Sequence, residues 1–446
     1  MPHNNLKMKL QLQNILKVES ADIELGGLTV ITGENDSGKS SIGKVLFSLL
    51  KATNNVKQVD KFKTLQFVNS HLLSVKRLFS HYNNVQILQD IQSTSIDLVE
   101  KNLTVEVLAE TIKKEAIKCG FTNRQAAILN DKFTQIQQNL SELENPVLAV
   151  KREFDIISRS EFMEPLSSYG TTHSSIYFHD DTTDADGSDI NLTFENGKIS
   201  DIKLWGDSSI EDITYVESPV YLHILDTLRM SSSVPTKSFR GISNSLQKGN
   251  IPYHLGDMAE KILNTAEDLL GLFHSNNYQP QLDEIRQLIG GNFTVDEKTK
   301  QLYFLRNGIS IPAVSVASGI KSFGVLLRLL QTDSISTSKM LVLDEPEIHL
   351  HPEWQISFCQ FIVELVTKGI PIVVSSHSPY FIQGLRYFAA ARGIEKDVVY
   401  YMAEQSSDTG LSKFKDVTND LNQVFTLLAA PLREIMNVDA VRNSLK

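Results

Sequence analysis

The sequence is poor in cysteine. Its 446 residues include only Cys119 and Cys359, which lie far apart and form no C-x-x-C pair. This scarcity argues against a disulfide framework and favours a reducing compartment. No apolar run is long enough to cross a bilayer, and the first residues lack the basic-then-apolar pattern of a secretion signal. The sequence therefore predicts a cytoplasmic protein with no membrane partner.

An excess of positive charge is also missing. The chain has 43 lysines and arginines against 53 acidic residues, which gives a formal net charge of −10. A wholly basic nucleic-acid binder is therefore disfavoured, although a local basic groove stays open because net charge hides distribution. The apolar and charged fractions are ordinary for a globular protein, and the length allows two or three structural units.

One glycine-bounded loop carries the strongest functional signal. A short apolar run at 28–32 predicts a buried strand before it, and apolar residues at helical spacing from Ile42 predict a helix after it. The loop fits the complete G-x-x-x-x-G-K-[ST] pattern of a phosphate-binding loop; its residues are Gly33, Glu34, Asn35, Asp36, Ser37, Gly38, Lys39 and Ser40, followed by Ser41. Backbone N–H groups and the helix end would hold phosphate oxygens. Lys39 would reach the β- and γ-phosphates, and the Ser40 hydroxyl would bind Mg²⁺.

Two further strands end in residues that suit phosphate chemistry. The apolar run 340–343 leads into Asp344 and Glu345, and the run 370–374 leads towards His377. Open α/β sheets bind ligands at the carboxyl ends of their strands. Asp344 is therefore predicted to hold Mg²⁺, directly or through water, and Glu345 to orient or deprotonate the attacking water. His377 is predicted to reach the γ-phosphate.

A second anion-friendly helix start lies between these motifs. Ser318 and Gly319 precede apolar residues at helical spacing, with Lys321 in the first turn. One triphosphate does not need two such helix ends from the same subunit. We therefore predict that Ser318, Gly319 and Lys321 cap nucleotide held by a second copy, in a two-fold, head-to-tail pair.

The middle of the chain changes character twice. Helical segments fill about 56–162, where the steps of three and four favour a packed helical hairpin over a free coiled coil; the apolar positions are Ala126, Leu129, Phe133, Ile136, Leu140 and Leu143. Strand-like alternation follows at 174–217, with an acidic tract at 180–189. A calcium loop there is disfavoured because Thr182 would be its first ligand and Thr193 its bidentate one, so a solvated hairpin tip is expected.

Together these motifs resemble ABC-type ATPases, and within them the SMC/RecF/OLD-like branch more than transporter subunits. Gly33–Ser40, Ser318-Gly319, Leu341–Pro346 and His377 look like the Walker A loop, signature, Walker B and switch histidine. The runs Ala-Ser-Gly-Ile-Lys-Ser-Phe, Asp-Glu-Pro-Glu-Ile-His-Leu-His-Pro and Ser-Ser-His-Ser-Pro-Tyr-Phe are similar to those of bacterial OLD-like ATPases, many of them in antiphage systems such as Septu and PARIS. The resemblance covers about 1–55 and 290–400, and it implies ATP and Mg²⁺ as ligands.

The chain also departs from this family pattern. The transporter signature Leu-Ser-Gly-Gly-Gln is reduced to Ala-Ser-Gly-Ile-Lys, and Glu217 stands where the Q-loop glutamine is expected. A carboxylate there would approach Mg²⁺ in place of an amide oxygen. OLD nucleases carry a Toprim domain after the ATPase, whereas only about seventy residues follow His377 and show no such pattern. The resemblance therefore implies a chain without its own nuclease.

These observations predict an α/β fold, an ABC-type P-loop ATPase head with a helical insertion and a small β segment. The expected parts are the first part of the head (1–55), the helical insertion (56–173), the β segment (174–219), a second helical block (220–290) and the rest of the head (291–446).

The favoured function is ATP hydrolysis by a homodimer or higher homo-oligomer that controls a separate effector, a nuclease, in antiphage defence. DNA or a phage protein would be the trigger. Two alternatives stay open: a DNA-repair or chromosome-maintenance ATPase, and a nucleotide-gated scaffold with little hydrolysis.

Overall fold

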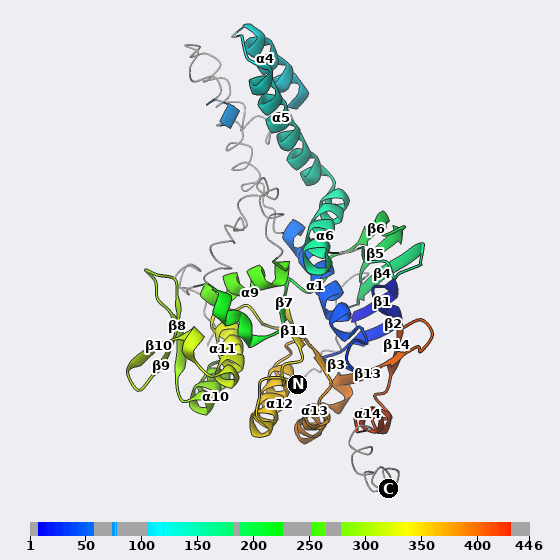
Figure 1. The fold of residues 1–446 in the computed structure, drawn as a ribbon, viewed down its shortest axis with the longest axis vertical. Coiled ribbons are helices and arrows are strands. Elements are labelled where there is room, and N and C mark those ends of the chain that lie inside the picture. Colours follow the sequence, from blue (N-terminus) through cyan, green and yellow to red (C-terminus); the bar gives the residue numbers. More distant parts are fainter. Residues whose placement is uncertain are drawn as a thin grey trace, which may run out of the picture. The chain divides into compact units, whose positions relative to one another are not determined.

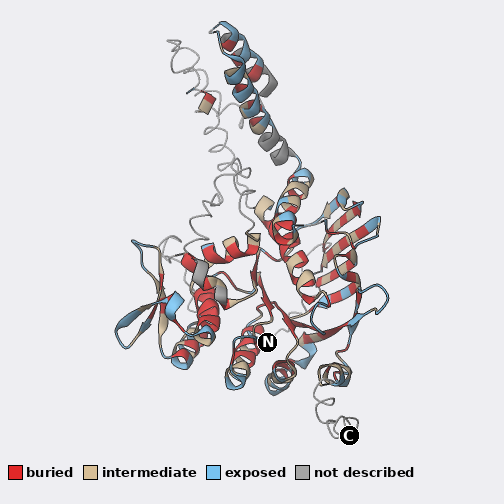
Figure 2. Cartoon of the chain, viewed as in Figure 1, coloured by how far each residue is buried: buried red, intermediate tan, exposed pale blue. Residues whose placement is uncertain are grey.

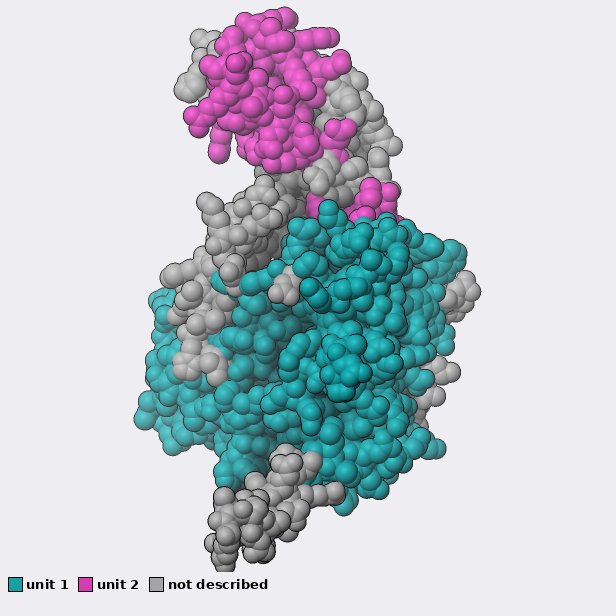
Figure 3. Space-filling model, turned by 45° about the vertical axis from the view of Figure 1, so that its right-hand side comes forward, with its two compact units in different colours: residues 1–51, 154–230, 251–446 teal, residues 52–153, 231–250 magenta. Residues whose placement is uncertain are grey.

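The computed structural model describes residues 8–57, 74–75, 77, 105–118, 120–163, 165–181, 187–225, 251–264 and 278–429. The chain forms two compact units (Figures 1 and 3). The first comprises Met1–Lys51, Phe154–Met230 and Ile251–Lys446, and the second comprises Ala52–Glu153 and Ser231–Asn250. All the residues predicted to handle nucleotide belong to the first unit.

The first unit is built on one 11-stranded sheet with the order β6-β5-β4-β1-β2-β14-β13-β3-β12-β11-β7. Its strands are β1 (Met8–Ile15), β2 (Val18–Leu25), β3 (Leu28–Thr32), β4 (His173–Asp180), β5 (Ser188–Glu195), β6 (Lys198–Trp205), β7 (Asp212–Val216), β11 (Lys339–Asp344), β12 (Ile372–Ser376), β13 (Val398–Gln405) and β14 (Ser412–Asp416). The fold is thus a mixed α/β architecture, as the sequence predicted.

One part of this sheet is entirely parallel. Strand β3 pairs with β13 and β12, and β12 continues through β11 to β7. Every residue of β3 and β12 is buried, and these strands appear as continuous red in Figure 2. Parallel strands are buried in this way when helices cover both faces of the sheet, which explains their unbroken apolar sequences.

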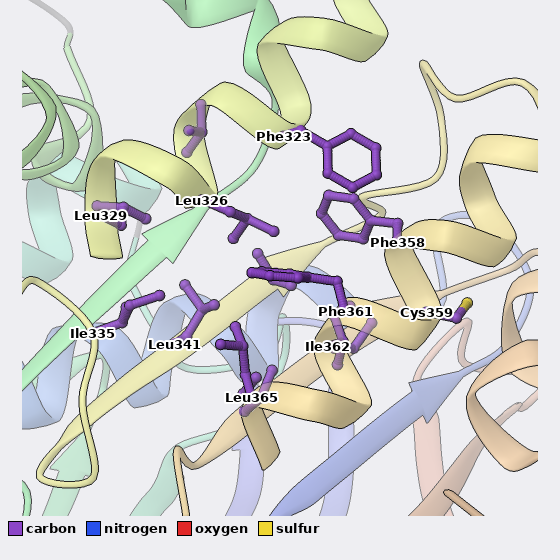
Figure 4. Packing of buried hydrophobic residues seen from close by; sticks show 14 of the residues in the cluster. Phe323, Leu326, Leu329, Ile335, Leu341, Phe358, Cys359, Phe361, Ile362 and Leu365 are labelled. Carbon is purple, nitrogen blue, oxygen red and sulfur yellow. The ribbon is translucent and has the colours of Figure 1, made fainter. Parts of the chain in front are cut away.

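Strand β11 shows how the two faces are filled. Leu341 and Leu343 belong to the apolar cluster that α11 (Ser318–Gln331) and α12 (Pro352–Thr367) form on one face. Figure 4 shows this packing, in which the rings of Phe323 and Phe358 lie with centroids 5.1 Å apart. On the other face, α1 (Lys39–Lys57) approaches so closely that a Cβ at Gly43 would lie 3.0 Å from Val342.

The other part of the sheet is an antiparallel meander. Strand β5 pairs with β4, β4 with β1 and β1 with β2, each time antiparallel, although β1 and β4 are far apart in the sequence. Buried and more exposed residues alternate along β4 and β5, as expected of strands with one face on the core and one towards water. The edge strand β6 is mostly exposed, and the alternating colours in Figure 2 show the difference from the parallel part.

The remaining elements of the first unit surround the sheet. They are η1 (Pro219–Ile224), α9 (Tyr253–Leu263), α10 (Gln279–Ile289), a three-stranded sheet of β8 (Asn292–Val295), β9 (Leu302–Arg306) and β10 (Ile309–Pro312), η4 (Ala313–Ser315), α13 (Pro379–Arg392), η5 (Glu395–Asp397) and α14 (Asn422–Leu428). No helix in the described part of the chain is long and apolar enough to span a membrane.

The second unit is helical where it is described. Helix α4 (Val105–Lys118) packs against α5 (Asn123–Glu144). Helix α6 (Pro146–Phe162) begins at the proline that interrupts the predicted seam, and its residues up to Glu153 belong to the second unit while those from Phe154 belong to the first. Leu129, Phe133 and Ile136 of that seam are buried, and so are Ile112 and Ala116 on α4. The sequence periodicity at these positions therefore reflects helix packing.

The acidic tract after β4 differs from its prediction at one end. Asp180 was expected at a solvated tip, but it is fully buried. Its Oδ2 accepts hydrogen bonds from the Ser208 hydroxyl and from the backbone and hydroxyl of Ser209, at 2.7–2.8 Å. Because a buried carboxylate needs such donors, this residue has a structural role. Thr182, the ligand that the disfavoured calcium loop would need first, lies outside the described residues.

Candidate nucleotide site

The register of the parallel strands aligns the predicted motifs along one edge. Thr32 at the end of β3 pairs with Ser376 of β12, and Ser375 pairs with Asp344 at the end of β11. Leu343 pairs in turn with Val216, the last residue of β7. The loop from Gly33, His377, Glu345 and Glu217 therefore all leave the sheet at neighbouring carboxyl ends, which is where open α/β sheets bind ligands.

The phosphate-binding loop adopts the backbone that its glycines allow. Gly33 has a φ of 148° and Gly38 a φ of 86°, and Asp36 between them has a φ of 64°. A Cβ at Gly33 would lie 2.8 Å from the Cβ of Ala403 on β13, so the loop passes too close to that strand for any side chain. Helix α1 begins at Lys39, so the N–H groups of its first turn lie directly after the loop.

Lys39 folds back over this loop and is almost fully buried. Its Nζ donates hydrogen bonds to the carbonyl oxygens of Gly33, at 3.1 Å, and Glu34, at 2.7 Å. The Oε1 of Glu345 lies 3.7 Å from the same ammonium. Burial lowers the pKa of Lys39, an effect that Glu345 and Asp344 partly offset. The cation is therefore held at the loop with little water to screen it.

Asp344 is a buried carboxylate with both oxygens engaged. The Tyr215 hydroxyl donates to Oδ2 at 2.7 Å, and the Ser375 hydroxyl donates to Oδ1. Burial and the neighbouring Asp344 raise the pKa of Tyr215 well above its usual value, so Tyr215 stays a neutral donor. These two hydroxyls fix the orientation of Asp344, and each oxygen keeps a second lone pair for water or a cation.

Glu345 faces the loop and the switch histidine. Its backbone has a φ of 47°, a conformation that costs a glutamate on the order of 1–3 kcal/mol. The Ser375 carbonyl holds this turn by accepting from the Glu345 N–H at 3.0 Å. Oε1 of Glu345 lies 3.0 Å from Nδ1 of His377. The two residues that were predicted for catalysis are thus in contact.

Glu217 is also held from several sides. Lys44 of α1 lies 3.3 Å from Oε1, and the Tyr221 hydroxyl donates to Oε2 at 3.1 Å. Nε2 of His254 lies 3.2 Å from the same Oε2. Burial opposes ionisation, but the contact with His254 and the charge of Lys44 lower the pKa of Glu217 to about 2. Glu217 is therefore a carboxylate at neutral pH.

The predicted signature residues lie apart from these contacts. Ser318 is exposed at the start of α11, and Gly319 is half-buried. A Cβ at Gly319 would lie 3.1 Å from the Trp354 ring. Lys321 points inwards, where it is buried and its Nζ donates to the Val314 carbonyl at 2.9 Å. Ser318 is therefore the accessible member of the three.

Comparison with known protein families finds a match for more than half of the chain. Residues 146–383, more than half of the chain, match the family described as "AAA domain, putative AbiEii toxin, Type IV TA system". The chain belongs to this AAA family. The matched part contains Glu217, Ser318, Asp344, Glu345 and His377, and the loop at 33–40 precedes it. No curated protein matches the chain.

Solved structures with weak likeness to this AAA chain include SMC heads. An SMC head domain from Thermotoga maritima has 11% identity and a TM-score of 0.38, with 93% of this chain and 99% of that chain covered. An SMC head bound to the C-terminal winged-helix domain of ScpA has 11% identity and a TM-score of 0.43, covering 93% and 98%. A third, an SMC head with an extended coiled coil bound to the C-terminal domain of ScpA, from Pyrococcus furiosus, has 11% and 0.38, covering 96% and 98%.

The residues present in the AAA chain fit a nucleotide with Mg²⁺. Lys39 supplies a desolvated cation at the turn of the loop, and the N-terminus of α1 supplies N–H donors. Asp344 supplies an oriented carboxylate two strands away, at the same edge. Oxygen ligands of this kind suit Mg²⁺, which is usually held by one or two carboxylates together with phosphates and water.

Sequence reasoning missed the residues that support this edge. Glu347 is buried, and its Oε1 accepts from the Ser376 hydroxyl at 2.5 Å and from the His377 N–H at 3.3 Å. The signal for Glu347 was present in the Asp-Glu-Pro-Glu run. Tyr215 and His254 had no such signal, because each contacts the site through a residue distant in the sequence.

Proposed function

We propose that this AAA chain binds ATP with Mg²⁺ at the edge formed by β3, β12, β11 and β7, and hydrolyses it. The observation that carries the proposal is the strand register, which puts the loop at 33–40, Asp344, Glu345 and His377 at adjacent strand ends. The loop meets there two motifs that lie more than three hundred residues further along the chain. A chance glycine-rich loop would not have these partners.

The geometry supports a distinct role for each residue. Lys39 would leave the neutral carbonyls of Gly33 and Glu34 to pair with phosphate oxygens, whose negative charge makes them stronger acceptors for the ammonium. Ser40 and Asp344 would hold the Mg²⁺, which when bound neutralises charge on the phosphates. Glu345 would take the proton of the attacking water, and His377 would orient Glu345 and reach the γ-phosphate.

Removal of the Lys39 cation tests nucleotide binding. In Lys39→Ala, the phosphates lose their buried charge partner, and we expect ATP affinity to fall by about 100-fold, the equivalent of about 3 kcal/mol for a charged hydrogen bond. Isothermal titration of wild type and variant measures this change. Lys9→Ala, which removes a lysine from β1 in the antiparallel part, is the matched control. Equal ATP affinity in all three proteins would contradict the proposal.

We also propose that two copies close around nucleotide, head to tail, with Ser318 and Gly319 of one copy on the phosphates of the other. The exposure of Ser318 at the first position of α11 supports this role. Ser318→Arg should block hydrolysis without loss of ATP binding. Mixing it with Lys39→Ala should restore part of the activity, because one composite site then carries neither change. Absence of recovery at every mixing ratio argues against capping in trans.

The biological role that we propose is control of a separate effector, a nuclease, in antiphage defence. The family description, which names a putative AbiEii toxin and a type IV toxin–antitoxin system, supports a defence setting. ATP-driven closing would then report a trigger, DNA or a phage protein, to the effector. Co-purification of a nuclease encoded beside the gene tests this role; a neighbourhood of repair genes would favour a DNA-repair ATPase.

A further inference from the structure

His254, on the first turn of α9, lies between two carboxylates in the interior of the first unit. Its side chain is completely buried. Nδ1 lies 2.7 Å from Oε2 of Glu161, and Nε2 lies 3.2 Å from Oε2 of Glu217. Carboxylates only accept hydrogen bonds, so both ring nitrogens face acceptors. Nδ1 makes a hydrogen bond with Glu161, whereas Nε2 contacts the Glu217 carboxylate at ion-pair distance without an aligned hydrogen bond. The His254 N–H also donates to Oε1 of Glu161 at 2.8 Å.

Aromatic rings fix the plane of this imidazole. The Tyr215 ring lies with its centroid 5.0 Å from that of His254, in an edge arrangement, and the Phe47 ring lies at 6.3 Å. Tyr215 is the residue whose hydroxyl orients Asp344. The same small group of side chains therefore contacts both Asp344 and Glu217.

Glu217 lies where orientation matters. It follows Val216, which pairs with Leu343, so Glu217 and Asp344 occupy matching positions on neighbouring parallel strands. Such strands lie about 4.8 Å apart. The carboxylate is thus within reach of whatever Asp344 holds, directly or through water.

A purely structural buried ion pair offers a contrast on the same helix. Asp257 and Lys261 of α9 join Lys51 and Asp212 in a closed cluster, with four N–O distances of 2.5–2.9 Å. Each charge there pairs within the cluster, and none of the four residues stands at a strand's carboxyl end. His254 differs because one of its two partners lies at the phosphate edge.

We propose that His254 is a positioning residue that holds the Glu217 carboxylate towards the metal side of the nucleotide site. The inference rests on the proposed function. Without Nε2, the carboxylate keeps Lys44 and Tyr221 as partners but loses one of the three groups that fix its orientation. Outer partners of this kind are worth about 10–100-fold in metal affinity.

Two substitutions separate the two sides of the ring. His254→Asn keeps a donor near Nδ1, towards Glu161, and removes the one at Nε2. His254→Gln keeps a donor near Nε2, towards Glu217. Both remove the imidazole ring, so they form a matched pair. The readout is Mn²⁺ affinity by electron paramagnetic resonance in the presence of a non-hydrolysable ATP analogue, together with analogue affinity in EDTA.

We expect His254→Asn to weaken Mn²⁺ binding by about 10-fold or more, and His254→Gln by much less. Analogue affinity in EDTA should stay unchanged in both. In a Glu217→Gln background, the His254 substitutions should have no further effect on Mn²⁺, because the two residues act through one contact. Equal Mn²⁺ affinity in wild type and His254→Asn, or additive losses in the double variant, would overturn the proposal.

Asp257→Asn controls for loosening of α9. It breaks the closed cluster on the same helix, so it should lower the melting temperature and leave Mn²⁺ affinity unchanged; a matching loss of Mn²⁺ affinity would show that His254 acts only through helix stability. If His254→Asn does not fold, Glu217→Gln alone must show the 10-fold loss, and its absence overturns the proposal. Failure of the wild type to bind the analogue both with Mn²⁺ and in EDTA would instead refute the proposed function.

Discussion

The parallel and antiparallel parts of the large sheet differ in how many of their residues are buried and in whether they carry residues of the candidate site. In the parallel part, β3 and β12 are buried along their whole length, and every loop at their carboxyl ends carries a polar residue of the candidate site. In the antiparallel part, β4 and β5 bury alternate residues only, and no predicted site residue lies on them. In the described part of the sheet, the candidate site residues thus lie at the ends of the parallel strands, and β4 and β5 carry none of them.

The difference follows from how the strands are connected. Parallel neighbours need crossovers, so helices such as α1 and α12 cover both faces, and all carboxyl ends meet at one edge. Antiparallel neighbours can be joined by a short turn, as β1 and β2 are, so their ends alternate. Strands β4 and β5 also leave one face towards water. Both parts contain a buried carboxylate with hydroxyl donors: Tyr215 and Ser375 donate to Asp344 in the parallel part, and Ser208 and Ser209 donate to Asp180 of β4 in the antiparallel part. Only Asp344 lies at the edge where the predicted motifs meet.

The largest expected effect comes from Glu345 at the parallel edge. Glu345→Gln keeps the size of the side chain and removes the base, so the hydrolysis rate should fall by about 10²–10⁴-fold. ATP affinity should change little, because the loop at 33–40 supplies the binding contacts. Single-turnover hydrolysis and isothermal titration measure the two quantities.

The antiparallel part provides the control for this prediction. Glu195→Gln changes an exposed glutamate at the end of β5 in the same way, and it should leave hydrolysis unaffected. Wild-type hydrolysis in Glu345→Gln would assign the base to another residue. A comparable rate loss in Glu195→Gln would show that the two parts of the sheet do not differ as described.

The sequence predicted the parallel edge well because its signals are local. The loop at 33–40 needs glycines at two places, and the buried strands before Asp344 and His377 are continuous apolar runs that are easily recognised. Strand register then follows from the parallel fold. For these residues, local pattern and global structure agree, which is what a consistent sequence provides.

What the sequence did not predict depends on contacts between distant segments. Glu161, Glu217 and His254 meet from α6, the loop after β7, and α9, and nothing in the residues next to each of them indicates a partner. Asp180 was expected in water because its neighbours are acidic, but Ser208 and Ser209 satisfy it inside the protein. Such pairs are set by packing, and periodicity carries no information about them.

Smaller effects are expected from changes in core packing. Such changes test whether a local distortion in each part of the sheet alters ATP binding at the candidate site. A Cβ at Gly43 would lie 2.9 Å from Tyr215 and 3.0 Å from Val342, so Gly43→Val should overpack the parallel part and cost about 1–3 kcal/mol. Because the Tyr215 hydroxyl orients Asp344, this variant should also weaken Mg²⁺-dependent ATP binding. Thermal unfolding and titration in Mg²⁺ and in EDTA measure both effects.

Ile176→Ala is the counterpart in the antiparallel part. Ile176 is fully buried on β4, and its truncation should cost about 2–5 kcal/mol. Below its melting temperature, however, this variant should bind ATP as tightly as wild type, with and without Mg²⁺, since β4 contributes no residue to the edge. Mg²⁺-dependent ATP binding should therefore weaken in Gly43→Val, the variant with the smaller loss of stability, and stay unchanged in Ile176→Ala. If ATP affinity instead followed stability in both variants, Tyr215 would be one packing residue among many, and its hydroxyl would not set the orientation of Asp344.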